Sequence, residues 1–168
     1  MKLLKILKEV MMTPAMTPLI YKLEDAGWRR VGSGDWGIVL EKGEKVKKIT
    51  TDSLEIEDAL ALQGHNSPYI IPILNVEKLA DNLAIIDMPN AQELDNAEKD
   101  MIYDAEQAAE DYIVYGKENA LENTPEPMKD FIVGVKKGLM DAGVDLDNLD
   151  WSPYNVMKYN GKYVLIDV

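Results

Sequence analysis

Hydrophobic and polar residues alternate over short runs in the first half of the chain, with glycines between the runs. The segment WRRVGSGDWGIVLEKGEKVKKIT (28–50) predicts three short antiparallel strands on this basis. The segment YIIPILNVEKLADNLAIIDM (69–88) predicts two more. Between the two segments, Asp52 or Ser53 can cap a helix that runs to about Gly64. The first half is therefore expected to form a small sheet with one principal helix.

Apolar residues recur every three or four positions in the second half, which predicts helices over residues 93–115 and 126–142. Five residues give the second helix one apolar face: Met128, Phe131, Ile132, Val135 and Leu139. Gly143 is suited to end that helix. We expect an α+β fold, with a mostly β region over 1–88 and a mostly helical region over 89–168.

Two helical stretches are expected to open the chain, with Thr13-Pro14 and Thr17-Pro18 as breaks and helix starts. The first, MKLLKILKEVMM, carries a charge every few residues and no small-residue cleavage site. We interpret it as an amphipathic helix and not as a signal peptide. No later segment is apolar over enough residues to span a membrane. Cysteine is absent, which excludes disulfides and thiolate nucleophiles and fits the reducing cytoplasm.

The net charge of −12 is distributed unevenly along the 168 residues. Residues 1–52 hold ten lysines and arginines against seven acidic residues, whereas the remainder holds eight against 23. The acidic body argues against general nucleic-acid binding. It suits a basic protein partner or carboxylates gathered around a metal, and a solvated acidic surface is the plainer explanation for most of these charges.

A glycine motif of the form GxGxxGxV comprises Gly32, Ser33, Gly34, Gly37 and Val39. In a dinucleotide-binding fold such glycines lead into a helix, but here they lead into a predicted strand. Glycines in a strand–turn–strand hairpin let backbone amides approach phosphates without obstruction from side chains. Glycine also simply makes turns, so the motif alone leaves both explanations open.

A lysine follows the glycine motif on the next predicted strand. Val46 and Lys48 share one face of that strand, and Lys48 could neutralise phosphate oxygens beneath the glycine hairpin. Lys45 and Lys47 are better explained as a solvated basic edge. The helix that follows can supply a carboxylate to hold Lys48, and the sequence leaves three candidates open: Glu55, Glu57 and Asp58.

The last segment predicts a hairpin with Asn160-Gly161 at its tip, a pair favoured where both turn residues need positive φ. Counting outward from the tip places Asn155 opposite Ile166, so Asn155 and Asp167 lie at the open end and could share a magnesium ion. Strict alternation would point these two side chains to opposite faces, so the chain must bend or leave the ladder there. Asp150, in the preceding loop, could orient a hydroxyl group. A polar loop that caps a hairpin is the alternative.

Taken together and in this order, the motifs resemble those of protein kinases. The glycine motif matches the glycine-rich loop, and Lys48 matches the strand lysine. The segment NLDWSPYN matches the catalytic loop through Asp150, Pro153 and Asn155, and LIDV matches the metal-binding segment through Asp167.

The segment LAIIDMPNAQEL (83–94) resembles the hinge that connects the two lobes of a kinase. This match puts Ile86 at the gatekeeper position, Asp87 first in the hinge and Glu93 near the ribose. Pro89 falls where a hinge residue normally donates its N–H to the adenine, and proline has no N–H to donate. A shift of one residue to Met88 could restore that bond.

The resemblance covers roughly residues 20–168 and is greatest to the small phage-encoded serine/threonine kinases that modify host transcription machinery. It implies a minimal two-lobed protein-kinase-like fold, with an antiparallel N-lobe and a truncated helical C-lobe, that binds ATP and Mg²⁺. Lys48 and Asp150 would be catalytic, and Asn155 and Asp167 would hold the metal. The residues implied to contact the nucleotide are Gly32, Ser33, Gly34, Gly37, Val39, Val46, Lys48, Asp87, Met88 and Glu93.

Several positions depart from the kinase pattern. Asn148-Leu149 replace the usual His-Arg, and Ser152 replaces a lysine near the transferring phosphoryl group. The segment that normally binds a peptide substrate after Asp167 is missing. Two alternatives follow: a degenerate kinase-like module that blocks a host protein, and a small-molecule phosphotransferase, which usually has larger helical insertions. The resemblance implies a host protein as target. No nucleic-acid or membrane partner is expected, and the oligomeric state is left open.

Overall fold

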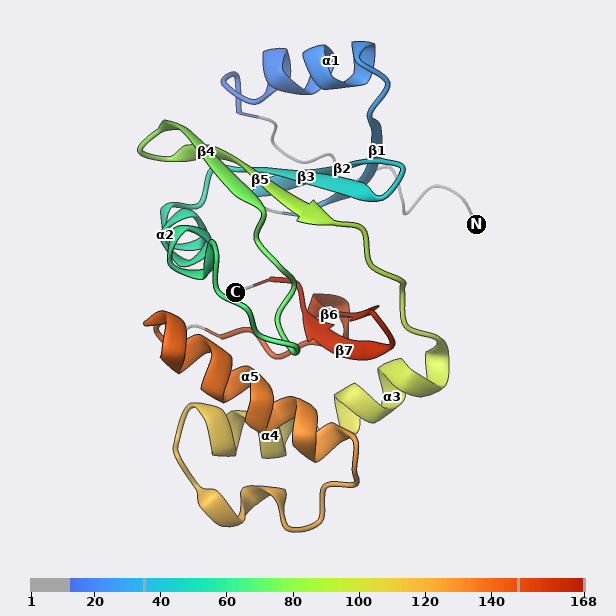
Figure 1. Ribbon diagram of the computed structural model, residues 1–168, viewed down its shortest axis with the longest axis vertical. Helices are drawn as coiled ribbons and strands as arrows, with labels where there is room; N and C mark the ends of the chain where they lie inside the picture. Colours follow the sequence, from blue (N-terminus) through green and yellow to red (C-terminus); the bar gives the residue numbers. More distant parts are fainter. Residues whose placement is uncertain (1–12, 35, 148, 168) are drawn as a thin grey trace. The chain divides into compact units, whose positions relative to one another are not determined.

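The computed structural model describes residues 13–34, 36–147 and 149–167, so the first of the two opening helices lies outside the described residues (Figure 1). The N-terminal half contains a five-stranded antiparallel sheet of order β1-β2-β3-β5-β4. Its strands are β1 (Arg29–Ser33), β2 (Gly37–Lys42), β3 (Lys45–Thr50), β4 (Asn75–Ala80) and β5 (Leu83–Pro89). Helices follow this sheet along the chain, which confirms the predicted α+β fold.

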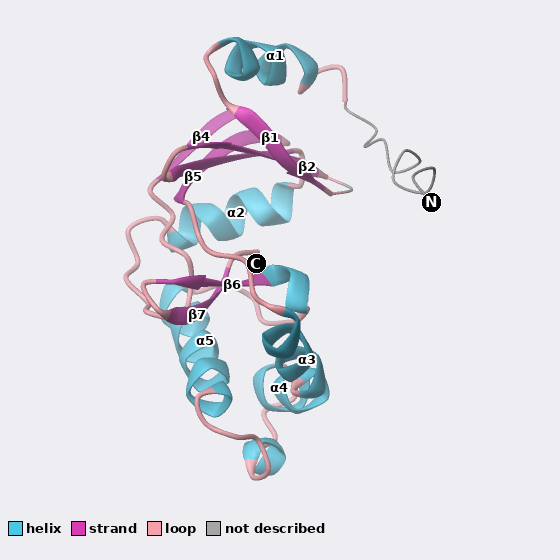
Figure 2. Cartoon of the chain, turned by 90° about the vertical axis from the view of Figure 1, so that its right-hand side faces the viewer, coloured by secondary structure: helices cyan, strands magenta, loops and turns pink. Residues whose placement is uncertain are grey.

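Helix α1 (Thr17–Asp25) covers one face of the sheet (Figure 2). Met16 and Ile20 pack there against Ile38, Leu40 and Ile49 of the sheet, and all five are buried. Because successive side chains of a strand point to opposite faces, the residues between them are directed to the other face of the sheet. The alternation of residues along the strands therefore puts one set of side chains on the face that packs against α1 and another set on the opposite face.

Helix α2 (Ser53–Leu62) begins where the sequence predicts. The Asp52 side chain accepts a hydrogen bond from the Leu54 N–H at 2.9 Å, and the Asp52 carbonyl accepts from Ile56 at 3.1 Å. Asp52 is therefore the capping residue, and it fixes the start of α2 directly after β3.

The second half is mainly helical, with α3 (Asn96–Asp104), α4 (Glu106–Ile113), η1 (Glu118–Leu121) and α5 (Met128–Ala142). The single helix expected over 93–115 is two helices that meet at Ala105, and Asp95 caps α3 in a capping box with Glu98. The five apolar residues predicted for α5 are all buried, and Gly143 ends it with φ 77°, as expected. Within the described ranges, no helix has the length and apolar character needed to cross a bilayer.

The segment before β4 differs from the prediction. YIIPIL was expected to begin a strand of the sheet, but Ile70 and Ile71 lie next to β7 (Lys162–Leu165), where the Ile71 N–H donates to the Leu165 carbonyl at 2.9 Å. The reason lies in α5, where Gly134 and Gly138 leave no room for a Cβ beside Tyr69, Ser67 and Ile70. The two glycines form a recess that this segment fills.

Two compact units result, and they do not follow a single cut in the sequence. The first contains the chain up to residue 57 together with Leu74–Asn90, and the second contains Asp58–Ile73 and the chain from Ala91 onward. The predicted regions 1–88 and 89–168 therefore differ from these units chiefly in the segment that fills the α5 recess.

The chain ends in the predicted hairpin of β6 (Val156–Tyr159) and β7. Tyr159 pairs with Lys162, and Asn160 and Gly161 have φ of 51° and 76°, as the Asn-Gly pair predicts. The short helix η2 (Pro153–Asn155) precedes β6 and contacts α3 (Figure 2).

Candidate functional site

The glycine motif forms the β1–β2 hairpin, as predicted. The Gly34 N–H donates to the Gly37 carbonyl at 2.9 Å. The Trp36 carbonyl accepts from the Thr51 N–H at 2.8 Å and from the Thr51 hydroxyl at 3.1 Å. These bonds attach the hairpin to the end of β3. Among the described residues beyond its two chain neighbours, none has an atom within 4 Å of a Cβ added at Gly34. The hairpin therefore combines an anchored base with an open backbone surface.

Gly37 is required for close packing between the hairpin and the lysine strand. A Cβ at Gly37 would lie 3.0 Å from the Ile49 carbonyl oxygen and 3.3 Å from Cε of Lys48. The Lys48 side chain thus passes directly beside the glycine backbone, and any larger residue at position 37 would displace it.

Lys48 forms an ion pair with Glu55, in the first turn of α2, at 2.5 Å. Both side chains are only 14% exposed. The Thr50 hydroxyl donates to the other Glu55 oxygen at 2.6 Å and accepts from the Asp52 N–H at 3.1 Å. Of the three carboxylates left open by the sequence, Glu55 is therefore the partner of Lys48. Thr50 was not foreseen; it is the buried polar residue of the described core.

Residues predicted to contact a nucleotide share one face of the sheet. Val39 pairs with Lys48, Lys48 with Ile86, and Val46 with Met88, so these five side chains are directed away from α1. They combine an apolar surface, against which an aromatic base can lie, with one cation for phosphate.

Asp87 has its side chain on the opposite face. Its carboxylate accepts from Lys47 at 2.5 Å, and Lys47 also lies over the Trp28 ring, 5.3 Å from the centroid. The Asp87 carbonyl accepts from the Leu74 N–H at 2.8 Å. Asp87 can therefore contribute to a nucleotide site only through its main chain, and Lys47 is part of an internal network and not of a solvated edge.

In the second unit, the Asn155 amide nitrogen contacts Asp150 twice, donating to the Asp150 carbonyl at 3.1 Å and to its carboxylate at 3.1 Å. Ser152 lies between them and caps η2 through the Tyr154 N–H at 3.2 Å. Asp150 itself is exposed to solvent. The bonds fix the direction of the Asn155 side chain, so its amide oxygen is the atom available to a cation.

Asn155 and Asp167 both lie outside the hairpin ladder, at its open end. The Ile166 N–H donates to the Asn155 carbonyl at 2.9 Å, as the predicted register requires. Because neither residue is part of a strand, alternation does not force their side chains apart. No group of three or more His, Asp or Glu side chains in the described ranges is arranged to hold a metal. One amide and one carboxylate instead match the way Mg²⁺ binds together with phosphate oxygens.

The hairpin is fixed to α3 by an ion pair between Lys158 and Glu98. The hydrogen bond from Lys158 lowers the pKa of Glu98, and the same bond raises the pKa of Lys158. Burial raises the pKa of the neighbouring Tyr163. Gln92 pairs with Lys158 through two main-chain bonds of 2.8 Å, and Glu93 beside it is exposed in the loop that leads to α3.

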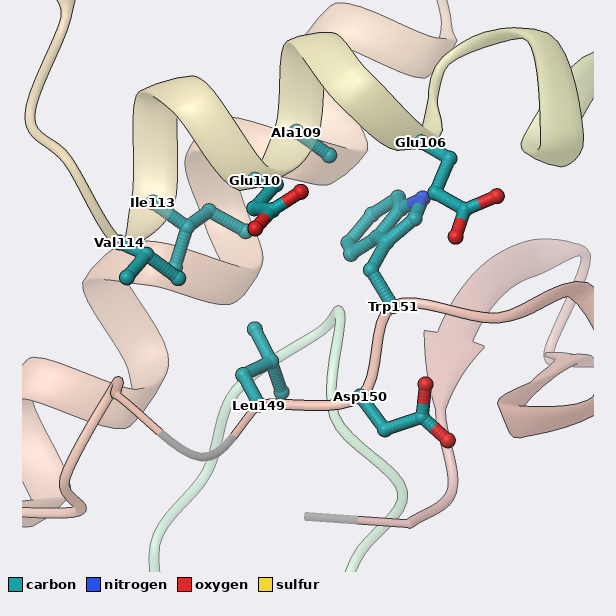
Figure 3. Close-up of a pocket in the computed structure, with 8 residues that line it drawn as sticks. All are labelled: Glu106, Ala109, Glu110, Ile113, Val114, Leu149, Asp150 and Trp151. Carbon is teal, nitrogen blue, oxygen red and sulfur yellow. The ribbon is translucent and has the colours of Figure 1, made fainter.

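A pocket of about 210 Å³ lies next to the Asp150 loop (Figure 3). Helix α4 supplies one wall, including Glu106 and Glu110, and Leu149 and Trp151 supply the other. The sequence does not predict this pocket, because its walls come from residues 106–114 and 149–151, which are far apart in the chain.

No protein-family model matches the chain, and no curated protein matches it. Solved structures with a similar backbone include aminoglycoside phosphotransferases. A thermostable mutant of APH(4)-Ia in its apo form is 13% identical, over 88% of this chain and 70% of that chain, with a TM-score of 0.41. The GDP and kanamycin complex of APH(2")-IIia is 14% identical, over 91% of this chain and 71% of that chain, with a TM-score of 0.40. In other APH(4)-Ia structures the matched region spans only 39 to 40% of that chain.

Proposed function

We propose that the protein is a nucleotide-dependent phosphotransferase that uses ATP and Mg²⁺. The Lys48–Glu55 ion pair carries this proposal. A lysine that is 14% exposed and held by a carboxylate, beneath a glycine hairpin and among apolar side chains, has an arrangement suited to bind phosphate oxygens. A purely structural ion pair would not need the open glycine backbone beside it.

Phosphoryl transfer depends mainly on positioning and on neutralisation of charge. Lys48 would bind phosphate oxygens, with Glu55 and Thr50 fixing its ammonium group. Val39, Val46 and Met88 would contact the base. Mg²⁺, when bound, would neutralise the phosphates, and Asn155 and Asp167 would hold it. Asp150 would accept a hydrogen bond from the acceptor hydroxyl and orient its oxygen for attack.

We further propose a serine or threonine of a host protein as the acceptor, in the manner of the phage kinases that modify transcription machinery. The supporting observations are the resemblance of the motifs and the acidic C-terminal region, which suits a basic protein partner. A small-molecule acceptor is the second candidate, because small-molecule phosphotransferases share the Asp…Asn…Asp layout that Asp150, Asn155 and Asp167 resemble.

The test combines binding and transfer on the full chain. Mg-ATP should raise the melting temperature of the protein, and labelled ATP should transfer phosphate to itself or to a host protein. Asp150→Ala should abolish transfer but retain nucleotide binding, whereas Lys48→Ala should weaken both. If Mg-ATP neither binds nor is consumed, the phosphotransferase proposal is wrong and a role in blocking a host protein takes its place.

A further inference from the structure

The pocket beside the Asp150 loop has a wall of mixed chemistry (Figure 3). Ile113 and Leu149 make part of it apolar, while Glu106 and Glu110 place two carboxylates on successive turns of α4. The Asp150 carboxylate is directed away from them and contacts Asn155. The negative charge inside the pocket therefore comes from the two glutamates of α4. The Asp150 carboxylate, proposed to orient the acceptor, does not contribute to it.

Trp151 supplies a second and independent feature. Its side chain is 5% exposed, yet its Nε1 has no hydrogen-bond partner within the described part of the chain. The ring packs against Phe131, with centroids 5.2 Å apart, and enters the pocket toward Glu106 and Glu110 (Figure 3). The indole N–H is a donor only, and a buried donor without an acceptor costs stability. The pocket thus presents a fixed donor that a ligand oxygen can satisfy.

The size of the pocket limits what it can hold. Its volume of about 210 Å³ is below the range of roughly 300–1,000 Å³ that is typical of sites for whole small-molecule ligands. One side chain of a larger partner is a better match. An amphipathic cation is suited to these walls, because its hydrocarbon stem packs on the apolar part while its charged head reaches the carboxylates.

We propose that this pocket binds an arginine side chain of the protein acceptor, beside the hydroxyl that Asp150 orients. The proposal rests on the proposed function for the role of Asp150. Arginine is favoured over lysine because its planar guanidinium can contact two carboxylates and stack on the indole ring. A main-chain carbonyl of the same acceptor would accept the Trp151 N–H. Residues 91–168 hold seven lysines against 17 acidic residues, which favours the approach of a basic partner.

Binding can be tested without any phosphate transfer. The probe is N-acetylarginine amide, with N-acetylcitrulline amide as its neutral counterpart of similar shape. The readout is the ¹⁵N–¹H signal of the Trp151 indole, assigned by its loss in Trp151→Phe. The signal should shift with the arginine probe and not with citrulline. Glu110→Gln should weaken binding about tenfold, because it removes a charge-assisted bond while preserving side-chain volume.

The matched control is Glu122→Gln, which makes the same change of charge at an exposed position that does not line the pocket. It should leave the titration unchanged, and an equal loss in both variants would show a general effect of net charge and overturn the proposal. A Trp151 signal that ignores the arginine probe, or responds equally to citrulline, would also overturn it.

A transfer assay separates this inference from the proposed function. With serine peptides that differ only by arginine or citrulline, Glu110→Gln should raise KM for the arginine peptide about tenfold and leave kcat nearly unchanged. If no peptide is phosphorylated and Mg-ATP does not bind, the proposed function fails, and the titration still decides whether the pocket takes arginine. If peptides are phosphorylated with equal KM, the pocket inference alone is wrong.

Discussion

The lysine of the first unit and the aspartate of the second are held in different ways. Lys48 is on a central strand and 14% exposed, and its partner Glu55 is held in turn by Thr50. Asp150 is exposed, on a loop, and its carboxylate accepts a hydrogen bond from Asn155. The residues proposed to handle phosphate are therefore part of the fold, whereas the residue proposed to handle the acceptor is nearly independent of it. Mutations of Lys48 should therefore affect both stability and activity, whereas mutations of Asp150 should affect activity alone.

The largest effect is expected from Asp150→Asn. The substitution preserves size and leaves the Asp150 carbonyl to accept from Asn155, but it weakens the group that accepts the hydroxyl proton. Phosphate transfer should fall about 10²- to 10⁴-fold. The melting temperature should stay within error of the wild-type value, because an exposed loop side chain contributes little stability. A large loss of stability would contradict the proposed independence of this loop.

Lys48→Met and Lys47→Met form a matched pair on neighbouring positions of β3. Lys48→Met should strongly weaken the stabilisation by Mg-ATP and lower stability by about 2 kcal/mol, because it removes the cation from the mostly buried Glu55 carboxylate. Lys47→Met should cost about 1 kcal/mol through Asp87 but retain nucleotide binding, since it lies on the α1 face. Urea denaturation and thermal shifts with Mg-ATP measure both. Equal losses of nucleotide binding would show that the assignment of faces is wrong.

Gly37→Ala should destabilise the protein by about 1–3 kcal/mol, because the added Cβ would press on the Ile49 carbonyl and on Lys48. Gly34→Ala adds its Cβ to open space and should change stability by less than about 0.5 kcal/mol. Chemical denaturation without nucleotide compares the two. Similar stability in both variants would mean that Gly37 does not guide the lysine side chain.

Thr50→Val removes the hydroxyl that connects Glu55 to the start of α2, at nearly constant side-chain volume. The Thr50 hydroxyl contacts Glu55 at 2.6 Å, the Asp52 N–H at 3.1 Å and the Trp36 carbonyl at 3.5 Å, so its loss at a buried site should cost about 1–2 kcal/mol. Thr51→Val is the control, since the Thr51 hydroxyl bonds to the Trp36 carbonyl and not to Glu55. Mg-ATP affinity should fall in Thr50→Val and change less in Thr51→Val; the reverse order would remove Thr50 from the support of Lys48.

The smallest effect concerns the Glu98–Lys158 ion pair, which joins α3 to β6 within the second unit. The pKa of Glu98 is lowered below 4.5, so its contribution to stability is present above that pH and is lost as the pH falls through the folded value. The pKa of Lys158 is raised above 10.5, so its contribution is present below that pH and is lost as the pH rises through the folded value. Glu98→Gln should therefore reduce the loss of stability as the pH falls below 4.5. If the free energy of unfolding of Glu98→Gln depended on pH in the acid range as that of the wild type does, the proposed role of this ion pair would be wrong.

Local patterns predicted much of the fold. The alternation in β2, β3 and β5, the spacing of apolar residues in α5 and the Asn160-Gly161 turn each depend on neighbours in sequence, and the structure confirms them. The prediction that YIIPIL begins a strand of the sheet was wrong, because an apolar run alone does not reveal which element it packs against. Its partner is a recess formed by two glycines more than 60 residues later in the chain.

The site was predictable to the extent that it follows strand register. Counting from the hairpin tip placed Asn155 opposite Ile166, and alternation placed Val46 and Lys48 together. The partner of Lys48 could not be chosen, because that depends on how α2 is rotated against β3, which is a matter of tertiary packing. The same holds for Trp151, whose pocket requires α4 to lie beside the loop.

The recess in α5 limits how the polypeptide can be divided. Glycine at positions 134 and 138 costs roughly 1 kcal/mol each in intrinsic helix stability relative to alanine. The helix is therefore expected to need the segment around Tyr69 to persist, and that segment precedes β4 and β5 in the chain. A fragment that starts at residue 91 would lack it. A fusion that joins residues 58–73 directly to Ala91, without β4 and β5, would retain the segment and is the way to produce the C-terminal unit alone.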